Sequence, residues 1–218
     1  MAKNGDKLNF GQDFFVKFYQ AFLYSDRWQQ YFKGVGTTLL VTAIALVLGV
    51  VLGAIVAMVR VGYAQQKPHH RNPILGVLNA VCQVYVTVIR GTPMMVQLLI
   101  MSMVIFASSR NFTMVGALAL GINSGAYVSE VIRGGLMAVD PGQMEAGRSL
   151  GLNYMTTMFE IIIPQAIRSI LPALGNEFIM LLKDSSLITV IGGKELLYAA
   201  QGIMNRTYEP MFPLLGVA

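Results

Sequence analysis

Three polar residues in an otherwise apolar stretch are spaced so that they share one face of a helix. Asn123, Tyr127 and Glu130 are separated by four and then three residues, and residues 111–129 carry no charge. Such positions lie on the same helical face. Polar groups at membrane depth are costly unless they face protein or water, so this stripe predicts an interior path for a polar solute. Glu130 either binds the ammonium or guanidinium group of that solute or pairs with Arg133.

Two further polar sets are candidates for the same path. Thr92 and Gln97 flank Pro93, which breaks a helix and frees backbone groups in the way that interrupted transporter helices do at their binding sites. The run Lys183-Asp184-Ser185-Ser186 follows the last long apolar stretch. It either gates the outer mouth of the path or caps and links helices, and the sequence leaves both interpretations open.

A polar segment after the third apolar stretch has the signals of a short helix followed by a sharp turn. Asp140-Pro141-Gly142 forms a turn that can cap a helix beginning near Gln143. Glu145 then lies in the first turn, where a carboxylate suits the positive end of the helix dipole. Gly151 ends this helix and permits a sharp bend. Pro164 begins the next helix, at a position where its missing N–H is harmless.

Four apolar segments are candidates to position these residues across about 30 Å of hydrocarbon. They are Gly36–Val59, Asn72–Ser109, Asn111–Ser129 and about 165–182. The second is too long for one span, and we expect Gly91-Thr92-Pro93 to divide it into an approach helix and a spanning helix from about Pro93 to Ala107. The fourth carries Arg168 and Glu177, which are rarely lipid-facing, so we expect it to pack against protein.

The two ends of the chain are less regular. Phe10–Phe32 mixes aromatic with charged residues, which favours an interfacial helix over a ligand-stacking surface. Residues 185–205 are interrupted by Gly192-Gly193 and predict a re-entrant or interfacial hairpin. Pro210–Ala218 is too short to cross a bilayer.

Composition supports a helical membrane protein with one domain. The chain has 218 residues, of which 55% are hydrophobic and 12% are charged, and it contains 22 glycines. Its mean hydropathy is +0.58. Gly49–Gly53 and Gly121–Gly125 predict close helix crossings. The net charge is +5, but the basic residues do not form a run. This distribution indicates basic residues that flank membrane spans and not a surface that binds nucleic acid. His69 and His70 lie in a basic loop and favour no metal site.

The segment from Glu145 to Pro164 resembles the EAA loop of binding-protein-dependent ABC importers. Glu145-Ala146-Gly147, a glycine four residues on and Ile163-Pro164 match its pattern, with Gly147 in place of the usual alanine. In that family the loop is a short cytoplasmic helix that docks into a groove on an ATPase subunit. The resemblance implies a cytoplasmic coupling loop over about 140–164. Its coupling residues would be Gln143, Glu145, Ala146, Gly147, Ser149, Leu150 and Gly151.

The resemblance extends from about Gly34 to the end of the chain. Further matches to the polar-amino-acid branch, named for histidine, glutamine, arginine and glutamate uptake, are Arg90-Gly91-Thr92-Pro93, Asn123-Ser124-Gly125-Ala126-Tyr127, Val139-Asp140-Pro141-Gly142-Gln143, Ile163-Pro164-Gln165-Ala166 and Lys183-Asp184-Ser185-Ser186-Leu187. The resemblance implies the type I importer permease fold, which is all-α with about five transmembrane helices. The transmembrane domain would cover 34–218 and follow an extracytoplasmic or interfacial segment at 1–33.

The resemblance also implies function and partners. The chain would be the permease through which a polar amino acid enters a prokaryotic cell across its lipid membrane, and would hydrolyse nothing itself. It has no Walker A motif, zinc-binding helix motif or nucleophile elbow, so ATP and Mg would bind two partner ATPase subunits. A second permease, identical or paralogous, and an extracytoplasmic substrate-binding protein would complete the complex. The pathway residues would be Thr92, Gln97, Asn123, Ser124, Tyr127, Glu130, Lys183, Asp184 and Ser185.

Three alternatives to this interpretation stay open at the level of sequence. They are a permease for another small solute, a helix-bundle channel and a scaffold subunit without its own path. The positive-inside rule does not choose an orientation, because bases fall on both sides. The resemblance places the loop at 134–163 in the cytoplasm and, by parity, the N-terminus outside. Relatives finish with a complete span after Tyr208-Glu209-Pro210, so we expect the fifth helix to continue beyond Ala218.

Overall fold

The computed structural model describes residues 9–66 and 72–218, so His69 and His70 lie outside the described residues. The described residues contain helices and turns and no strand. The helices are α1 (Phe10–Phe22), α2 (Trp28–Ala64), α3 (Pro73–Gly91), α4 (Met94–Ile100), α5 (Phe112–Met137), α6 (Pro141–Ser149), α7 (Tyr154–Thr157), α8 (Ile163–Asp184), α9 (Leu196–Thr207) and α10 (Met211–Leu215). Shorter 3₁₀ and π turns join them at Tyr24–Asp26, Met101–Ile105, Met158–Ile162 and Ser185–Ile191.

Four helical stretches within the described residues are long and apolar enough to cross a membrane. They are Tyr24–Ala64, Pro73–Gly91, Phe112–Met137 and Tyr154–Ile191. The all-α membrane architecture predicted from the sequence is therefore confirmed. The predicted fifth span, continuing beyond Ala218, stays a prediction.

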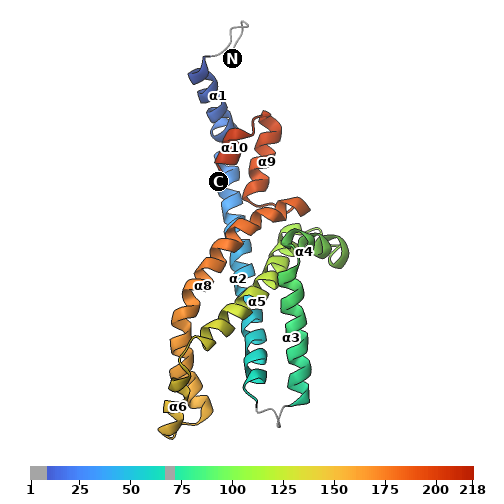
Figure 1. Cartoon of the computed structure of the whole chain (residues 1–218). Helices are drawn as coiled ribbons and strands as arrows, with labels where there is room; N and C mark the ends of the chain where they lie inside the picture. The colour runs from blue at the N-terminus through green and yellow to red at the C-terminus, as the bar shows by residue number, and fades with distance from the viewer. Residues whose placement is uncertain (1–8, 67–71) are drawn as a thin grey trace.

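The sequence predicted that the second apolar segment has an approach helix before its break and a spanning helix after it, and this prediction was wrong. The helix before the break, α3, is the one long enough to span, whereas Met94–Ile105 is a shorter apolar helix. At about 1.5 Å per residue this piece reaches only about 18 Å. The break itself lies where it was expected, because Thr92 and Pro93 have extended backbone angles. Beyond it, α4 turns away across the end of α3 (Figure 1).

The core is the crossing of α2 with α5, and glycines set its closeness. A Cβ atom on Gly49 would lie 2.6 Å from Oγ of Ser124, and one on Gly53 would lie 2.7 Å from Val128. On the facing helix, a Cβ on Gly121 would lie 2.6 Å from Leu48. Both small-residue pairs therefore pack as the sequence predicted, since their missing side chains let the two backbones approach.

The segments around α1, α9 and α10 gather at one end of the molecule. The rings of Phe14 and Phe212 meet edge to face at 4.9 Å, joining α1 to α10. Hydrogen bonds from Lys17 to Asp13 and Glu209 support this contact and raise the pKa of the lysine. The chain reaches α9 through a turn at Gly192, whose φ is 89°. The interruption predicted at Gly192-Gly193 is thus observed, with α9 packed along α2. A re-entrant or interfacial hairpin over 185–205 stays a prediction.

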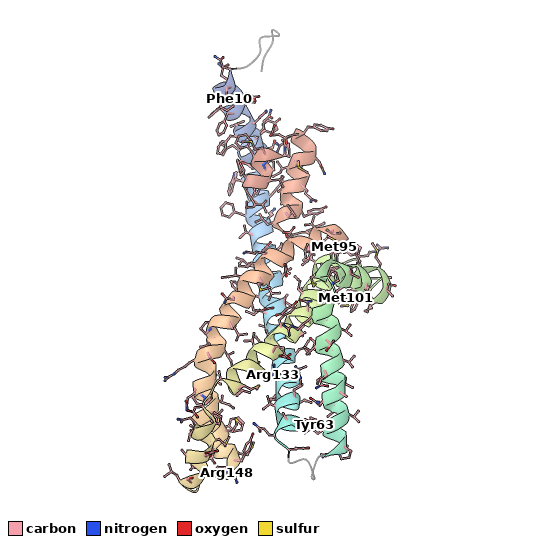
Figure 2. The ribbon with its side chains drawn as sticks, in the orientation of Figure 1. Phe10, Tyr63, Met95, Met101, Arg133 and Arg148 are labelled. Atoms are coloured by element: carbon pink, nitrogen blue, oxygen red, sulfur yellow. The ribbon has the colours of Figure 1, made fainter. Side chains whose placement is uncertain are left out.

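The coupling segment lies at the opposite end. Figure 1 shows α6 far from α1, and the end of α2 and the start of α3 lie toward the α6 end. Phe10 and Arg148 mark the two extremes in Figure 2. The long helices therefore connect two separate surfaces, one near α6 and one near α1, α9 and α10.

Candidate functional site

The first polar cluster bridges the helix break and α5. Nδ2 of Asn123 donates to Oε1 of Gln97 at 3.0 Å. Nε2 of Gln97 donates to Oγ1 of Thr92 at 2.7 Å and to the carbonyl oxygen of Ile89 at 2.8 Å. The structure thus brings together three of the predicted pathway residues. These hydrogen bonds hold the α3–α4 break against α5, which is a structural role for these side chains.

The second cluster places Glu130 between two arginines. Nη2 of Arg133 lies 2.7 Å from one carboxylate oxygen, and Nη1 of Arg60 contacts the other. The Glu130 and Arg60 side chains are 19% and 18% exposed. Of the two alternatives for Glu130, the pairing with Arg133 is the one observed. Arg60, which comes from α2, is a partner that the sequence did not indicate.

A groove lies beside this cluster, between α3, α5 and α8. Its volume is about 400 Å³, and its lining residues are Arg90, Tyr127, Glu130, Val131, Ala173, Asn176, Glu177 and Met180. The guanidinium group of Arg90 stacks over the Tyr127 ring at 5.1 Å. Glu177 is only 8% exposed, and its carboxyl group lies beside the Ser124 hydroxyl. Within the described residues neither Arg90 nor Glu177 makes an ion pair.

Sequence reasoning missed three polar residues of this groove as site residues. They are Arg90, Asn176 and Glu177, which come from α3 and α8. The available signal was a charge in an otherwise apolar stretch, since such groups in spans face protein or water and often serve function. Only the packing of three helices, however, shows that the charges face one groove.

The remaining predicted pathway residues do not line this groove. Ser124 is fully buried at the α2–α5 crossing. The hydroxyl groups of Ser185 and Ser186 each donate at 2.7 Å to a carbonyl oxygen at the end of α8, those of Leu182 and Lys183. Asp184 is the last residue of α8. Their geometry is that of a helix cap and link, and a gating role stays a prediction.

The short polar helix forms with the predicted caps at both ends. Oδ1 of Asp140 accepts the N–H of Gly142 at 2.7 Å. At the other end Gly151 has φ 84°, and its N–H and that of Leu152 donate to carbonyls of the last turn at 3.0 and 3.2 Å. This is the glycine-terminated geometry that leaves few unpaired carbonyls. The start was predicted two residues late, because Pro141 itself begins α6; Glu145 therefore lies in the second turn.

Gly147 differs from the family's alanine for a packing reason that the sequence did not show. It is the buried residue of α6, and a Cβ atom there would lie 2.6 Å from Cγ2 of Thr157. The chain resumes a helical course at Tyr154, earlier than the predicted start at Pro164. A π turn at Met158–Ile162 precedes Pro164, which has no N–H to continue an α-helical ladder.

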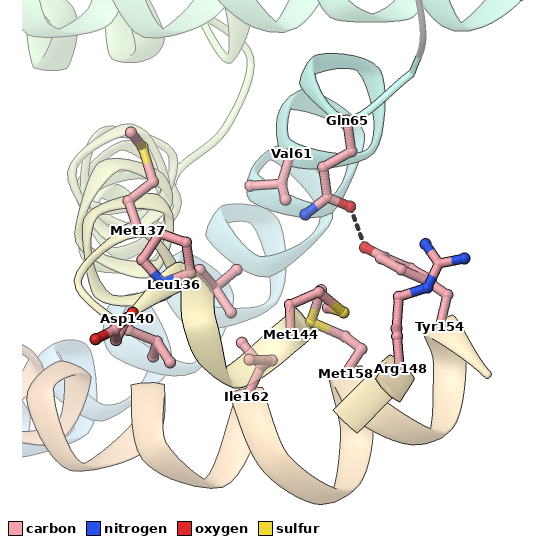
Figure 3. A pocket seen from close by; sticks show the side chains of 12 residues that line it. Val61, Gln65, Leu136, Met137, Asp140, Met144, Arg148, Tyr154, Met158 and Ile162 are labelled. Carbon is pink, nitrogen blue, oxygen red and sulfur yellow. Dashed lines mark hydrogen bonds between the residues drawn. The ribbon is translucent and has the colours of Figure 1, made fainter. Parts of the chain in front are cut away.

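The other predicted coupling residues form an outward surface. Gln143, Glu145, Ala146, Ser149, Leu150 and Gly151 are all exposed, and Leu150 is 81% exposed. Behind this surface lies a cavity of about 530 Å³ between the end of α2, α6 and residues 154–162. Figure 3 shows the Tyr154 hydroxyl group donating to Gln65 across its edge. A short helix with an apolar tip, held from behind, is suited to docking on another protein.

Long apolar helices, a charged groove between three of them and an exposed short polar helix at one end are features expected of a membrane transport subunit. The chain belongs to the family of binding-protein-dependent transport system inner membrane components, whose model matches residues 73–217.

Relatives and solved structures agree with this assignment. A putative glutamine transport system permease from Rickettsia bellii is 38% identical over 192 residues, covering 85% of this chain and 82% of that protein. The arginine transport system permease ArtQ of Bacillus subtilis is 32% identical, covering 84% and 80%. A chain in the crystal structure of an amino acid ABC transporter with histidines superposes with a TM-score of 0.78 at 37% identity, covering 97% and 90%.

Proposed function

We propose that this chain is the permease subunit of an ATP-driven importer for an amino acid whose side chain is polar and uncharged. Family membership and relatives named for glutamine and arginine transport support the general class. The charges of the groove support the finer assignment. One cation, Arg90, and one buried anion, Glu177, line the same groove without an ion-pair partner in the described part of the chain.

These two charges match the two ends of a zwitterion. In the proposed complex, Arg90 binds the α-carboxylate, for which its planar guanidinium group is well shaped. Glu177 binds the α-ammonium group, and Asn176 and Tyr127 lie within the same groove to contact the side chain. A cationic side chain would need a second free carboxylate. Glu130 does not provide one, because two arginines already bind it.

The exposed face of α6 supports coupling to separate ATPase subunits. In this proposal the ATPases close on ATP and press on α6, and the groove alternates between the two sides of the membrane. The first described helix, α1, lies at the end opposite to α6. A cytoplasmic α6 therefore places α1 outside, where the substrate-binding protein delivers the solute. A second permease, identical or paralogous, completes the path.

Uptake by the reconstituted complex tests the proposal. The permease, its ATPase and its binding protein are placed in liposomes, and uptake of radiolabelled glutamine, glutamate, arginine and histidine is measured with and without ATP. Glu177→Gln should raise KM at least tenfold, since a charge-assisted hydrogen bond contributes about 1.5–3 kcal/mol. Arg168→Gln, an exposed position on the same helix, is the matched control and should leave KM unchanged.

Two results would contradict the proposal. Flux that does not require ATP would favour a channel. Preferred uptake of arginine over glutamine would show that the groove's charges were interpreted incorrectly, while leaving the importer class intact.

A further inference from the structure

The depth of Lys33 in the membrane follows from the length of α2. Gly34–Val59 contains no charged residue and is bounded by Lys33 and Arg60. At about 1.5 Å per residue, the helix between these two bases is about 40 Å long. This matches the thickness of a bilayer that includes its headgroup regions, about 40–45 Å. With Arg60 at the cytoplasmic side, Lys33 lies among the headgroups of the outer leaflet.

A pocket opens at this level between α2 and α9. It has a volume of about 310 Å³, and its lining residues are Gln30, Lys33, Gly34, Thr37, Lys194, Glu195, Tyr198 and Ala199. Its floor is tightly packed, because a Cβ on Gly34 would lie 2.8 Å from Cα of Leu196. The N–H of Leu196 also donates to Oγ1 of Thr38 at 3.3 Å. The pocket walls therefore come from two helices held in fixed register.

The pocket has an excess of positive charge that the described residues do not neutralise. Lys33 and Lys194 are exposed and make no ion pair within the described residues. The Glu195 carboxylate is occupied, since it accepts the N–H groups of Leu197 and Tyr198, each at 2.8 Å, and the Thr189 hydroxyl. Glu195 is also only 2% exposed. Two ammonium groups therefore remain available to an anion that enters from outside.

Neighbouring side chains favour an anion that belongs to the membrane. Tyr198 in the pocket is 41% exposed, and Trp28, one turn and a half before Lys33, is 45% exposed. Exposed tyrosine and tryptophan are typical of the headgroup region. Arg206 adds a third cation nearby, because its Nη2 donates to Gln30 at 2.9 Å. A soluble anion would interact with the positive charges alone. The headgroup of a lipid would also lie at the depth of Lys33 and near the exposed rings of Tyr198 and Trp28.

We infer that the pocket between α2 and α9 binds the phosphate headgroup of an anionic phospholipid from the outer leaflet. Lys33 and Lys194 contact the phosphate oxygens, and the Tyr198 ring lies against the glycerol region. The site is separate from the Arg90–Glu177 groove and does not depend on which solute is carried.

Native mass spectrometry of the permease–ATPase complex tests this inference. The complex is released from bilayers of equal phosphatidylglycerol and phosphatidylcholine, and the lipids that it retains are counted. Wild type should retain phosphatidylglycerol preferentially. Lys33→Gln with Lys194→Gln should lower that preference by about 25-fold, about fivefold for each lysine near an anionic surface. Arg110→Gln removes an exposed base outside the pocket and should leave retention unchanged.

The conservative variant and a free-phosphate arm make the result decisive. Lys33→Arg with Lys194→Arg should keep the preference, and all variants should bind the ATPase as wild type does. Equal retention of the two lipids by wild type, or an unchanged preference in the double Gln variant, would overturn the inference. Displacement of the retained lipid by millimolar inorganic phosphate would identify a free-anion site and so would overturn the lipid assignment.

Discussion

The replacement Glu130→Gln separates two roles that the α5 stripe allows. In the structure the carboxylate holds Arg60 of α2 and Arg133 of α5 together at the α6 end of the span. If this is its function, the loss of its charge weakens the α2–α5 contact. If it were a solute ligand instead, the loss would appear in KM and not in stability.

The size of the stability effect follows from burial. Removal of one partner from a fully buried pair costs about 3–5 kcal/mol, and a hydrogen bond to a charged group is worth about 1.5–3 kcal/mol. Glu130 and Arg60 keep 19% and 18% exposure, so water screens part of the remaining charge. We therefore expect Glu130→Gln to lower the free energy of unfolding by about 2–4 kcal/mol.

The assay is unfolding of the chain in mixed micelles by titrated detergent, together with substrate KM in liposomes. A double-mutant cycle with Arg60→Gln should give a coupling energy of about 1–3 kcal/mol, since the second replacement removes a charge that the first has already left unpaired. The KM should stay within twofold of wild type. Unchanged stability with a tenfold rise in KM would refute this reasoning and return Glu130 to the solute path.

Two glycine positions give further predictions. Gly151→Val should abolish ATP-dependent uptake and ATPase co-purification without unfolding the spans, because φ of 84° is strongly disfavoured for a β-branched residue, whereas Gly151→Asn should retain both. Normal uptake by the valine variant would remove Gly151 from the coupling surface. Gly53→Ala should destabilise the α2–α5 crossing by about 1–3 kcal/mol, since its Cβ would lie 2.7 Å from Val128. Gly36→Ala on the same helix meets nothing within 4 Å and should be neutral or slightly stabilising; equal effects in both would contradict the packing argument.

Local signals explain why so much of the fold was predictable. The Asp140 cap, the Gly151 terminus and the break at Pro93 each depend on the conformational preference of a single residue. Hydropathy likewise indicated the spans, and small-residue spacing indicated that Gly49–Gly53 and Gly121–Gly125 lie at close helix crossings, without identifying the helix that each one meets. These features require no knowledge of what lies far away in the chain. Even so, the interpretation of the sequence chose the wrong part of the second apolar segment as the span, because α4 and the turn after it are apolar but too short to span.

The groove was not predictable in the same way, because its residues come from three helices. Arg90 and Glu177 are 87 positions apart in the chain, and each alone is a charge in an apolar segment. The partner of Glu130 was hidden for the same reason, since Arg60 lies 70 residues earlier. A sequence pattern places residues on one helix face but does not tell which other helix that face meets. The structure shows the pairing of Glu130 with Arg133, which is one of the two alternatives that the spacing left open.

The connection between α6 and the groove also depends on tertiary packing. Gly147 of α6 fits against Thr157, and the helical stretch Tyr154–Ile191 runs from that contact to Glu177 and beyond. The distance along the helix from Thr157 to Glu177 is about 30 Å at 1.5 Å per residue. A docking surface and a groove that share one helical element can be biased by the same partner, because a rigid helix that shifts at one end must shift at the other. The close fit of Gly147 against Thr157 is the point at which α6 is joined to that helix.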